Sequence, residues 1–108
     1  MNTETISAIK ALLLRVRAKI TDDTNVLWVP HETPAALRSD IDDDIALLGE
    51  LTPDTIHSLR FQYTGPSIFH NVAVCNGWGD EFLELAAEFE KLFIALQTGR
   101  APQTPPAQ

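Results

Sequence analysis

The last third of the chain carries the strongest helical pattern of apolar residues. Large apolar side chains recur there every three or four positions, within about 120° of one another around a helix axis. This stripe consists of Phe82, Leu85, Ala86, Phe89, Leu92, Phe93 and Leu96. Asp80 is the predicted N-cap of this helix, and Gly99 is predicted to end it. Because such a stripe needs cover, we expect the earlier segments to pack against it.

Three earlier segments show the same spacing and supply that cover. The first predicted helix runs from about residue 3 to residue 20, with an apolar stripe of Ile6, Ile9, Leu12, Leu13, Val16 and Ile20. The second begins at Thr33 and Pro34, and its stripe is Leu37, Ile41, Ile45 and Leu48, followed by Gly49. The third repeats the Thr-Pro start and covers residues 53–62. Residues 26–29 are interpreted as an extended connector that places Trp28 in the core.

The segment from Ser67 to Asn76 fits two structures. As a helix it starts at Ser67 and stops at Gly77, which has the conformational freedom that a helix end requires. As a strand it alternates Ile68, His70, Val72 and Val74 on one face and pairs with residues 59–63 in an antiparallel hairpin. We favour the helix because an isolated hairpin needs further support.

The sequence therefore predicts a mainly α protein, a compact single-domain bundle of four to five short helices. The alternative is an α+β fold with a small antiparallel hairpin at residues 59–75. The predicted helical domain spans residues 1–99, and residues 100–108 form a Pro-rich tail without an apolar stripe, which we expect to be disordered.

Composition and charge narrow the class of protein. The chain has 108 residues and a formal net charge of −7, so we expect no binding to nucleic acid. No apolar run is long enough to span a membrane, and basic residues interrupt the N-terminal apolar run that a signal peptide would need. Cys75 is the single cysteine, which favours a reducing compartment such as the cytoplasm.

The acidic residues are concentrated in the second predicted helix. Asp42 and Asp43 are expected to point away from its apolar stripe and to offer a docking face to a basic protein partner. Asp40 and Asp44 lie four residues apart at the edge of the stripe. We expect a cation of the first helix, namely Arg15, Arg17 or Lys19, to stand between these two carboxylates.

Two further features suggest contact surfaces. Trp78 lies between Gly77 and Gly79 in a tight turn, where its indole either caps the core or anchors a partner. On the last predicted helix, Leu83 and Ile94 fall outside the main stripe and would contact a second copy of the chain or a larger protein.

Catalytic and metal-binding motifs are not recognisable in this sequence. His31, His57 and His70 lack the spacing that places two metal ligands on one helix face, and we expect neither a metal nor a cofactor. Cys75 is expected to be a buried, unreactive thiol. The best enzyme hypothesis is a pocket near Trp28, His31, His70 and Trp78 in which a histidine acts as acid or base.

These observations favour a small acidic, non-enzymatic protein that serves as a protein–protein interaction module, of the inhibitor or immunity-protein type. The partner-binding residues of this hypothesis are Asp42, Asp43, Trp78, Leu83 and Ile94. The alternative is a small enzyme or ligand-binding domain that uses the pocket named above.

Overall fold

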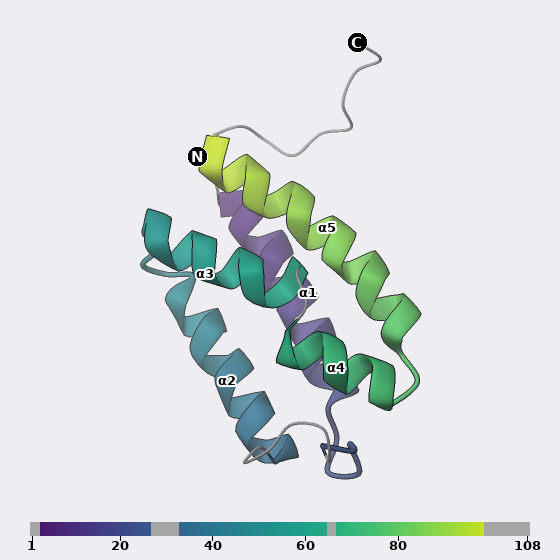
Figure 1. Ribbon diagram of the computed structural model, residues 1–108. Helices are drawn as coiled ribbons and strands as arrows, with labels where there is room; N and C mark the ends of the chain where they lie inside the picture. Colours follow the sequence, from purple (N-terminus) through teal and green to yellow (C-terminus); the bar gives the residue numbers. More distant parts are fainter. Residues whose placement is uncertain (1–2, 27–32, 65–66, 99–108) are drawn as a thin grey trace.

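The described part of the structure, a computed structural model, comprises residues 3–26, 33–64 and 67–98. It contains five helices and no strand (Figure 1): α1 (Thr3–Lys19), α2 (Pro34–Leu47), α3 (Pro53–Thr64), α4 (Ile68–Cys75) and α5 (Gly79–Thr98). The prediction of a mainly α single-domain bundle is confirmed. The alternative hairpin at 59–75 is wrong, because α3 and α4 occupy both of its proposed strands. The connector at Trp28 and the tail at 100–108 lie outside the described residues.

Hydroxyl groups cap three of the helices at their N-termini. The Thr33 Oγ1 accepts a hydrogen bond from the Ala36 amide at 3.0 Å, and Pro34 follows as the first helical residue. The same arrangement recurs at α3, where the Thr52 hydroxyl accepts from the Thr55 amide at 3.1 Å. Ser67 caps α4 in the same way, by accepting from the His70 amide. At each of these three helix starts, a side chain therefore satisfies one of the four backbone N–H groups that lack a partner within the helix.

The corner between α4 and α5 follows from its glycines. Gly77 adopts a φ of +82°, and the amide of Trp78 donates to the Ala73 carbonyl at 2.9 Å, which completes a Schellman motif. A Cβ at Gly79 would lie 3.1 Å from a methyl group of Val74, so the backbone passes close to that side chain. Because the Phe82 amide already bonds the Trp78 carbonyl, α5 starts before Asp80, and the prediction of Asp80 as N-cap is wrong.

The core is built around α5, which packs against α1, α3 and α4. Its three phenylalanines are buried, as the sequence pattern predicts. Tyr63 of α3 lies between Phe69 of α4 and Phe89 of α5, with ring centroids 5.2 and 5.1 Å apart. These aromatic contacts join three helices at one point and fix their relative positions.

Helix α2 is held mainly by α1, and it is separated from α5 (Figure 1). Buried Leu37 and Ile41 provide the apolar part of that contact. At the surface, Arg17 of α1 forms a bidentate ion pair with Asp42 of α2, at 2.7 and 3.1 Å. The face of α2 that points toward α3 and α4 is therefore left partly open.

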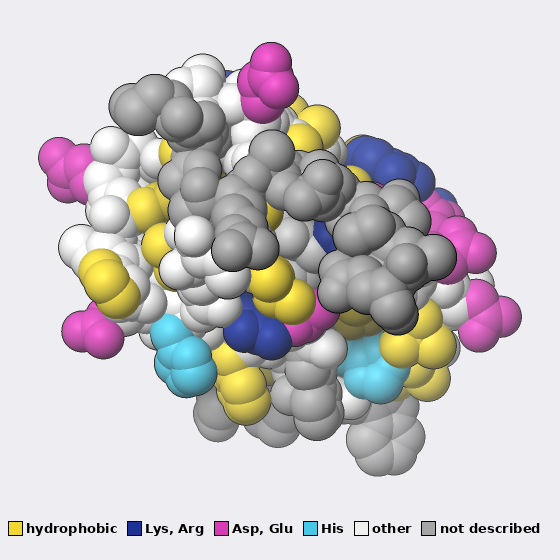
Figure 2. Space-filling view, turned by 90° about the horizontal axis from the view of Figure 1, so that it is seen from above, with side chains coloured by type: hydrophobic (Ala, Val, Ile, Leu, Met, Phe, Trp, Pro, Cys, Tyr) yellow, Lys and Arg dark blue, Asp and Glu magenta, His cyan; other side chains and the backbone are white. Residues whose placement is uncertain are grey.

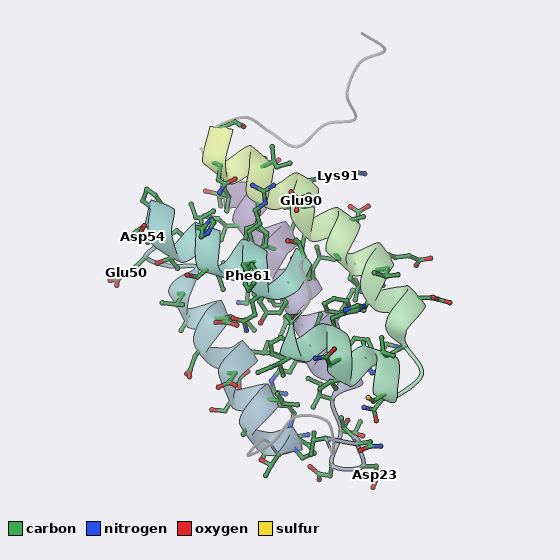
Figure 3. All side chains as sticks on the ribbon, in the orientation of Figure 1. Asp23, Glu50, Asp54, Phe61, Glu90 and Lys91 are labelled. Carbon is green, nitrogen blue, oxygen red and sulfur yellow. The ribbon has the colours of Figure 1, made fainter. Side chains whose placement is uncertain are left out.

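Charged side chains occupy much of the outer surface. Figure 3 shows Asp23, Glu50 and Asp54 projecting at the periphery of the bundle, while Phe61 lies on α3. The view from above in Figure 2 shows acidic groups around the edge of that face, with hydrophobic side chains between them. Ion pairs also link the helices, as in the pair of Lys19 and Glu81 at 2.6 Å between α1 and α5.

Candidate binding groove

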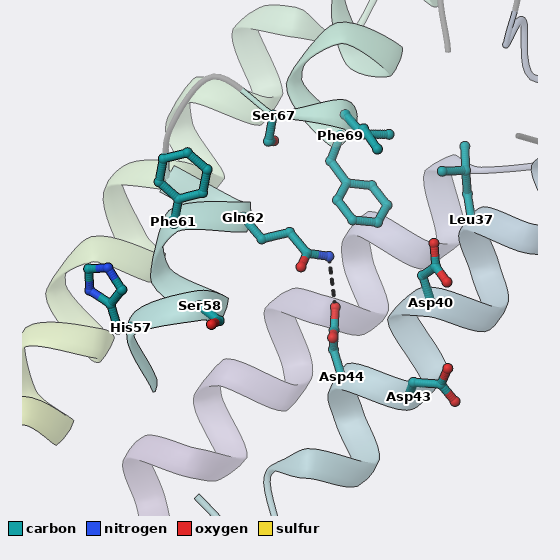
Figure 4. A pocket seen from close by; sticks show the side chains of 11 residues that line it. Leu37, Asp40, Asp43, Asp44, His57, Ser58, Phe61, Gln62, Ser67 and Phe69 are labelled. Carbon is teal, nitrogen blue, oxygen red and sulfur yellow. Dashed lines mark hydrogen bonds between the residues drawn. The ribbon is translucent and has the colours of Figure 1, made fainter. Parts of the chain in front are cut away.

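A groove of about 840 Å³ opens between α2, α3 and α4 (Figure 4). It is called the acidic groove below. The described residues that line it are Leu37, Asp40, Asp43, Asp44, His57, Ser58, Phe61, Gln62, Ser67, Ile68 and Phe69. Its size is within the range of about 300–1,000 Å³ found for ligand sites in proteins.

The two sides of the acidic groove differ in chemistry. Asp40, Asp43 and Asp44 line it from α2, and none of the described lining residues is Lys or Arg. On the opposite side Phe61 of α3 is 64% exposed and Ile68 of α4 is 44% exposed. Carboxylates lose their hydration when they pack against such apolar groups, so contact between the two walls without a cation would be unfavourable.

Asp44 is the most enclosed of the three carboxylates, at 9% exposure. Its Oδ2 accepts hydrogen bonds from the Tyr63 hydroxyl at 2.6 Å and from the Gln62 amide at 2.9 Å. Burial raises the pKa of Asp44 above its ordinary value, against the opposing effect of the Tyr63 hydrogen bond. The pKa of Tyr63 is also raised, first by burial and then by the negative charge of Asp44.

A smaller cavity of about 230 Å³ extends the acidic groove along α2 and α3. The two cavities share Asp44, Ser58 and Gln62, so they adjoin. The extension adds the exposed side chain of Leu47 and the carboxylate of Asp54. The alternation of acidic and apolar surface therefore continues beyond the main cavity.

Among the described residues, the groove carboxylate that accepts side-chain hydrogen bonds is Asp44. Neither His57 nor Ser58 shares a hydrogen bond with a groove carboxylate in this part of the chain. In those same residues, no group of three His, Cys, Asp or Glu side chains is placed to hold a metal ion. The groove offers charge and apolar contact to a ligand.

The predicted acidic docking face divides into two parts. Asp42 faces α1, where its hydrogen bond and charge interaction with Arg17 lower the pKa of its carboxyl group. Asp43 is exposed on the groove side of α2. The expectation that Arg15, Arg17 or Lys19 stands between Asp40 and Asp44 is wrong. Arg17 pairs with Asp42 and Lys19 pairs with Glu81, while Asp44 accepts hydrogen bonds from two uncharged donors of α3.

The structure brings two members of the alternative pocket near one another, outside the groove. His70 and Trp78 both contact the ring of Phe82, with centroid distances of 5.5 and 6.1 Å. Trp78 is buried, and its indole N–H has no hydrogen-bond acceptor among the described residues. Trp28 and His31 lie outside the described residues, so this pocket stays a prediction.

The second apolar patch is exposed on α5. Leu83 is 58% exposed and Ile94 is 42% exposed, on the side of the helix away from the core. Cys75, predicted to be buried, is a free thiol of intermediate exposure near the end of α4. It does not line the acidic groove.

Phe61 and Ile68 are two groove residues that the sequence hypotheses did not name as part of a site. A signal for Phe61 exists, because it lies two positions from both Leu59 and Tyr63 and therefore on the opposite face of the helix. Ile68 gives no such signal, since both structures considered for its segment place it beside other apolar residues.

Comparison with known protein families, with curated proteins and with solved structures finds no match for this chain. None of the helices in the described ranges is both long enough and apolar enough to cross a bilayer.

Proposed function

We propose that this chain is a small acidic, non-enzymatic interaction module that binds a basic segment of another protein in the acidic groove. The observation that carries the proposal is the position of three carboxylates opposite two exposed apolar side chains, with no Lys or Arg among the described lining residues. Such a surface is complementary to a ligand that is both cationic and apolar.

The two walls would contribute differently to binding. The net charge of −7 and the exposed carboxylates speed the encounter with a positively charged partner, and this effect weakens as salt is added. Burial of Phe61 and Ile68 supplies affinity, because large side chains that leave water at the centre of an interface dominate its binding energy. This division is typical of acidic inhibitors of basic targets.

The same charge supports a protein partner rather than a nucleic acid. The single free cysteine is compatible with a reducing compartment, so the partner is sought in the cytoplasm.

Site-specific photocrosslinking in cells tests the proposal. With Phe61 replaced by p-benzoylphenylalanine, we expect a protein with a basic segment to be crosslinked on illumination. The same photoreactive residue at Ala11, exposed on α1 and outside the groove, should not capture it. Capture at both positions, or at neither, would contradict a site in the groove.

Binding of the purified partner then separates local from overall charge. The variant Asp40→Asn/Asp43→Asn and the control Asp23→Asn/Glu84→Gln each remove two negative charges, but only the first changes the groove. We expect the groove variant to weaken binding by about tenfold or more and the control to stay within about twofold. If both variants lose the same affinity, the net charge of the chain would account for the effect, and a specific role of the groove carboxylates would be contradicted.

We also propose a second contact through α5, supported by the exposure of Leu83 and Ile94. Its occupant is a second copy of this chain. Light scattering at increasing concentrations should show a rise toward the dimer mass that Leu83→Ser/Ile94→Ser abolishes. A constant monomer mass would exclude the homodimer.

A further inference from the structure

The walls of the acidic groove present side chains of three helices and no free sheet edge. In the described residues every element is helical, so an extended ligand would find no strand with which to pair its backbone N–H and C=O groups. A helical ligand satisfies those groups internally and exposes only side chains. The groove therefore favours a ligand that is already helical when bound.

We propose that the segment bound in the acidic groove is a cationic amphipathic α-helix, with Lys or Arg side chains toward α2 and apolar side chains toward Phe61 and Ile68. This inference rests on the proposed function and adds the conformation and pattern of the ligand. Because the acidic and apolar walls come from different helices (Figure 4), one ligand must present two unlike faces at once. An amphipathic helix has that property.

The dimensions agree with a short helix. An α-helix with its side chains is about 10–12 Å across and rises about 5.4 Å per turn. A cavity of about 840 Å³ corresponds on those dimensions to roughly one and a half to two turns. The adjoining cavity beside Leu47 and Asp54 lengthens the contact along α2 and α3.

Asp44 offers a defined position for a cation of the ligand. Both of its described hydrogen bonds end on Oδ2, which leaves Oδ1 free to accept from a ligand in the groove. A guanidinium or ammonium group there would have the carboxylates of Asp40 and Asp43 on the same helix nearby. It would also offset the burial of an ionised carboxylate that no cation of the groove lining neutralises.

Two synthetic peptides of identical composition test this inference. Each contains only leucine and lysine over about 14 residues, or roughly four helical turns. In the first the leucines follow a helical spacing of three and four, and in the second leucine and lysine alternate as in a strand. Binding is measured by titration into the ¹⁵N-labelled chain, and the perturbed backbone amides identify the site.

We expect the helical peptide to perturb amides of α2, α3 and α4 around the groove and to bind about tenfold more tightly than the alternating peptide. If the alternating peptide binds the groove equally well, the helical ligand is refuted, whereas binding of a basic segment in the groove is retained. If neither peptide perturbs the groove, the proposed function fails together with the inference. Perturbation spread over all acidic surfaces would also contradict both.

Discussion

Single residues of α2 show how neighbouring carboxylates acquire different roles. The helical repeat predicts that Asp40 and Asp44 share a face and that Asp42 lies on another, and the structure agrees. The repeat does not reveal which side chain pairs with each carboxylate. Arg17 forms an ion pair with Asp42, and the Tyr63 hydroxyl donates a hydrogen bond to Asp44, because α1 and α3 approach α2 from different sides. Such pairings depend on tertiary packing, which a local pattern does not contain.

Substitution of Asp44 separates its role as an acceptor from its charge. Asp44→Ala leaves the buried Tyr63 hydroxyl and the Gln62 amide without their acceptor, so we expect a loss of about 1–3 kcal/mol in unfolding free energy. Asp44→Asn keeps an acceptor oxygen and removes a buried charge, so its stability at pH 7 should equal or exceed that of the parent chain. Urea denaturation measures both. A loss in Asp44→Asn as large as in Asp44→Ala would show that the charge itself stabilises the fold.

The pH dependence of stability should have opposite signs at Asp44 and Asp42. Because burial raises the folded-state pKa of Asp44, the folded state binds the proton more tightly, and ionisation lowers stability as the pH rises from about 3.9 through that pKa. The pKa of Asp42 is lowered by its hydrogen bond to Arg17, so its contribution is present above about 3.9 and is lost as the pH falls through the folded-state pKa.

Denaturation at pH 3 and pH 7 checks these signs. The unfolding free energy of the parent chain minus that of Asp44→Asn should be larger at pH 3 than at pH 7. The unfolding free energy of the parent chain minus that of Asp42→Asn should instead be larger at pH 7 than at pH 3. This second difference should be small and should decrease as salt is added, because the ion pair of Arg17 and Asp42 is exposed. The same sign for both carboxylates would contradict the environments described here.

At the scale of elements, most of the fold follows from local signals. The Thr-Pro starts of α2 and α3 and the apolar stripe of α5 predict those helices directly. The segment 68–75 is harder, because its β-branched residues favour a strand. Ser67 and Gly77 decide for the helix by satisfying backbone groups at its two ends.

Two glycine substitutions test the α4–α5 corner. Gly77→Ala should lower the unfolding free energy by about 1–2 kcal/mol, because an L side chain is strained at a φ of +82° even though the space there is open. Gly49→Ala is the matched control, since a Cβ there meets the Ala46 carbonyl oxygen at an ordinary 3.6 Å. Its stability should be unchanged or slightly raised, through a smaller entropy of the unfolded chain. Equal effects of the two substitutions would refute the conformational role of Gly77.

At the scale of the whole molecule, the acidic groove could not be predicted from the sequence. Asp43 was recognisable as an exposed acid, but the groove also needs Phe61 of α3 and Ile68 of α4 at the same opening. Their meeting depends on how three helices pack, and on α2 being held by α1 rather than by α5. Long-range packing of this kind creates a site without leaving a motif.

The central claim is that both walls of the acidic groove act on one ligand. It is tested most directly by the dissociation constant of the helical leucine–lysine peptide for two matched variants. Asp43→Asn/Phe61→Ser removes one carboxylate and one exposed apolar side chain from the groove, and Glu84→Gln/Leu14→Ser removes the same kinds of group elsewhere. We predict that the first weakens binding by more than about tenfold and that the second stays within about twofold. Equal affinities of the two variants would contradict the account.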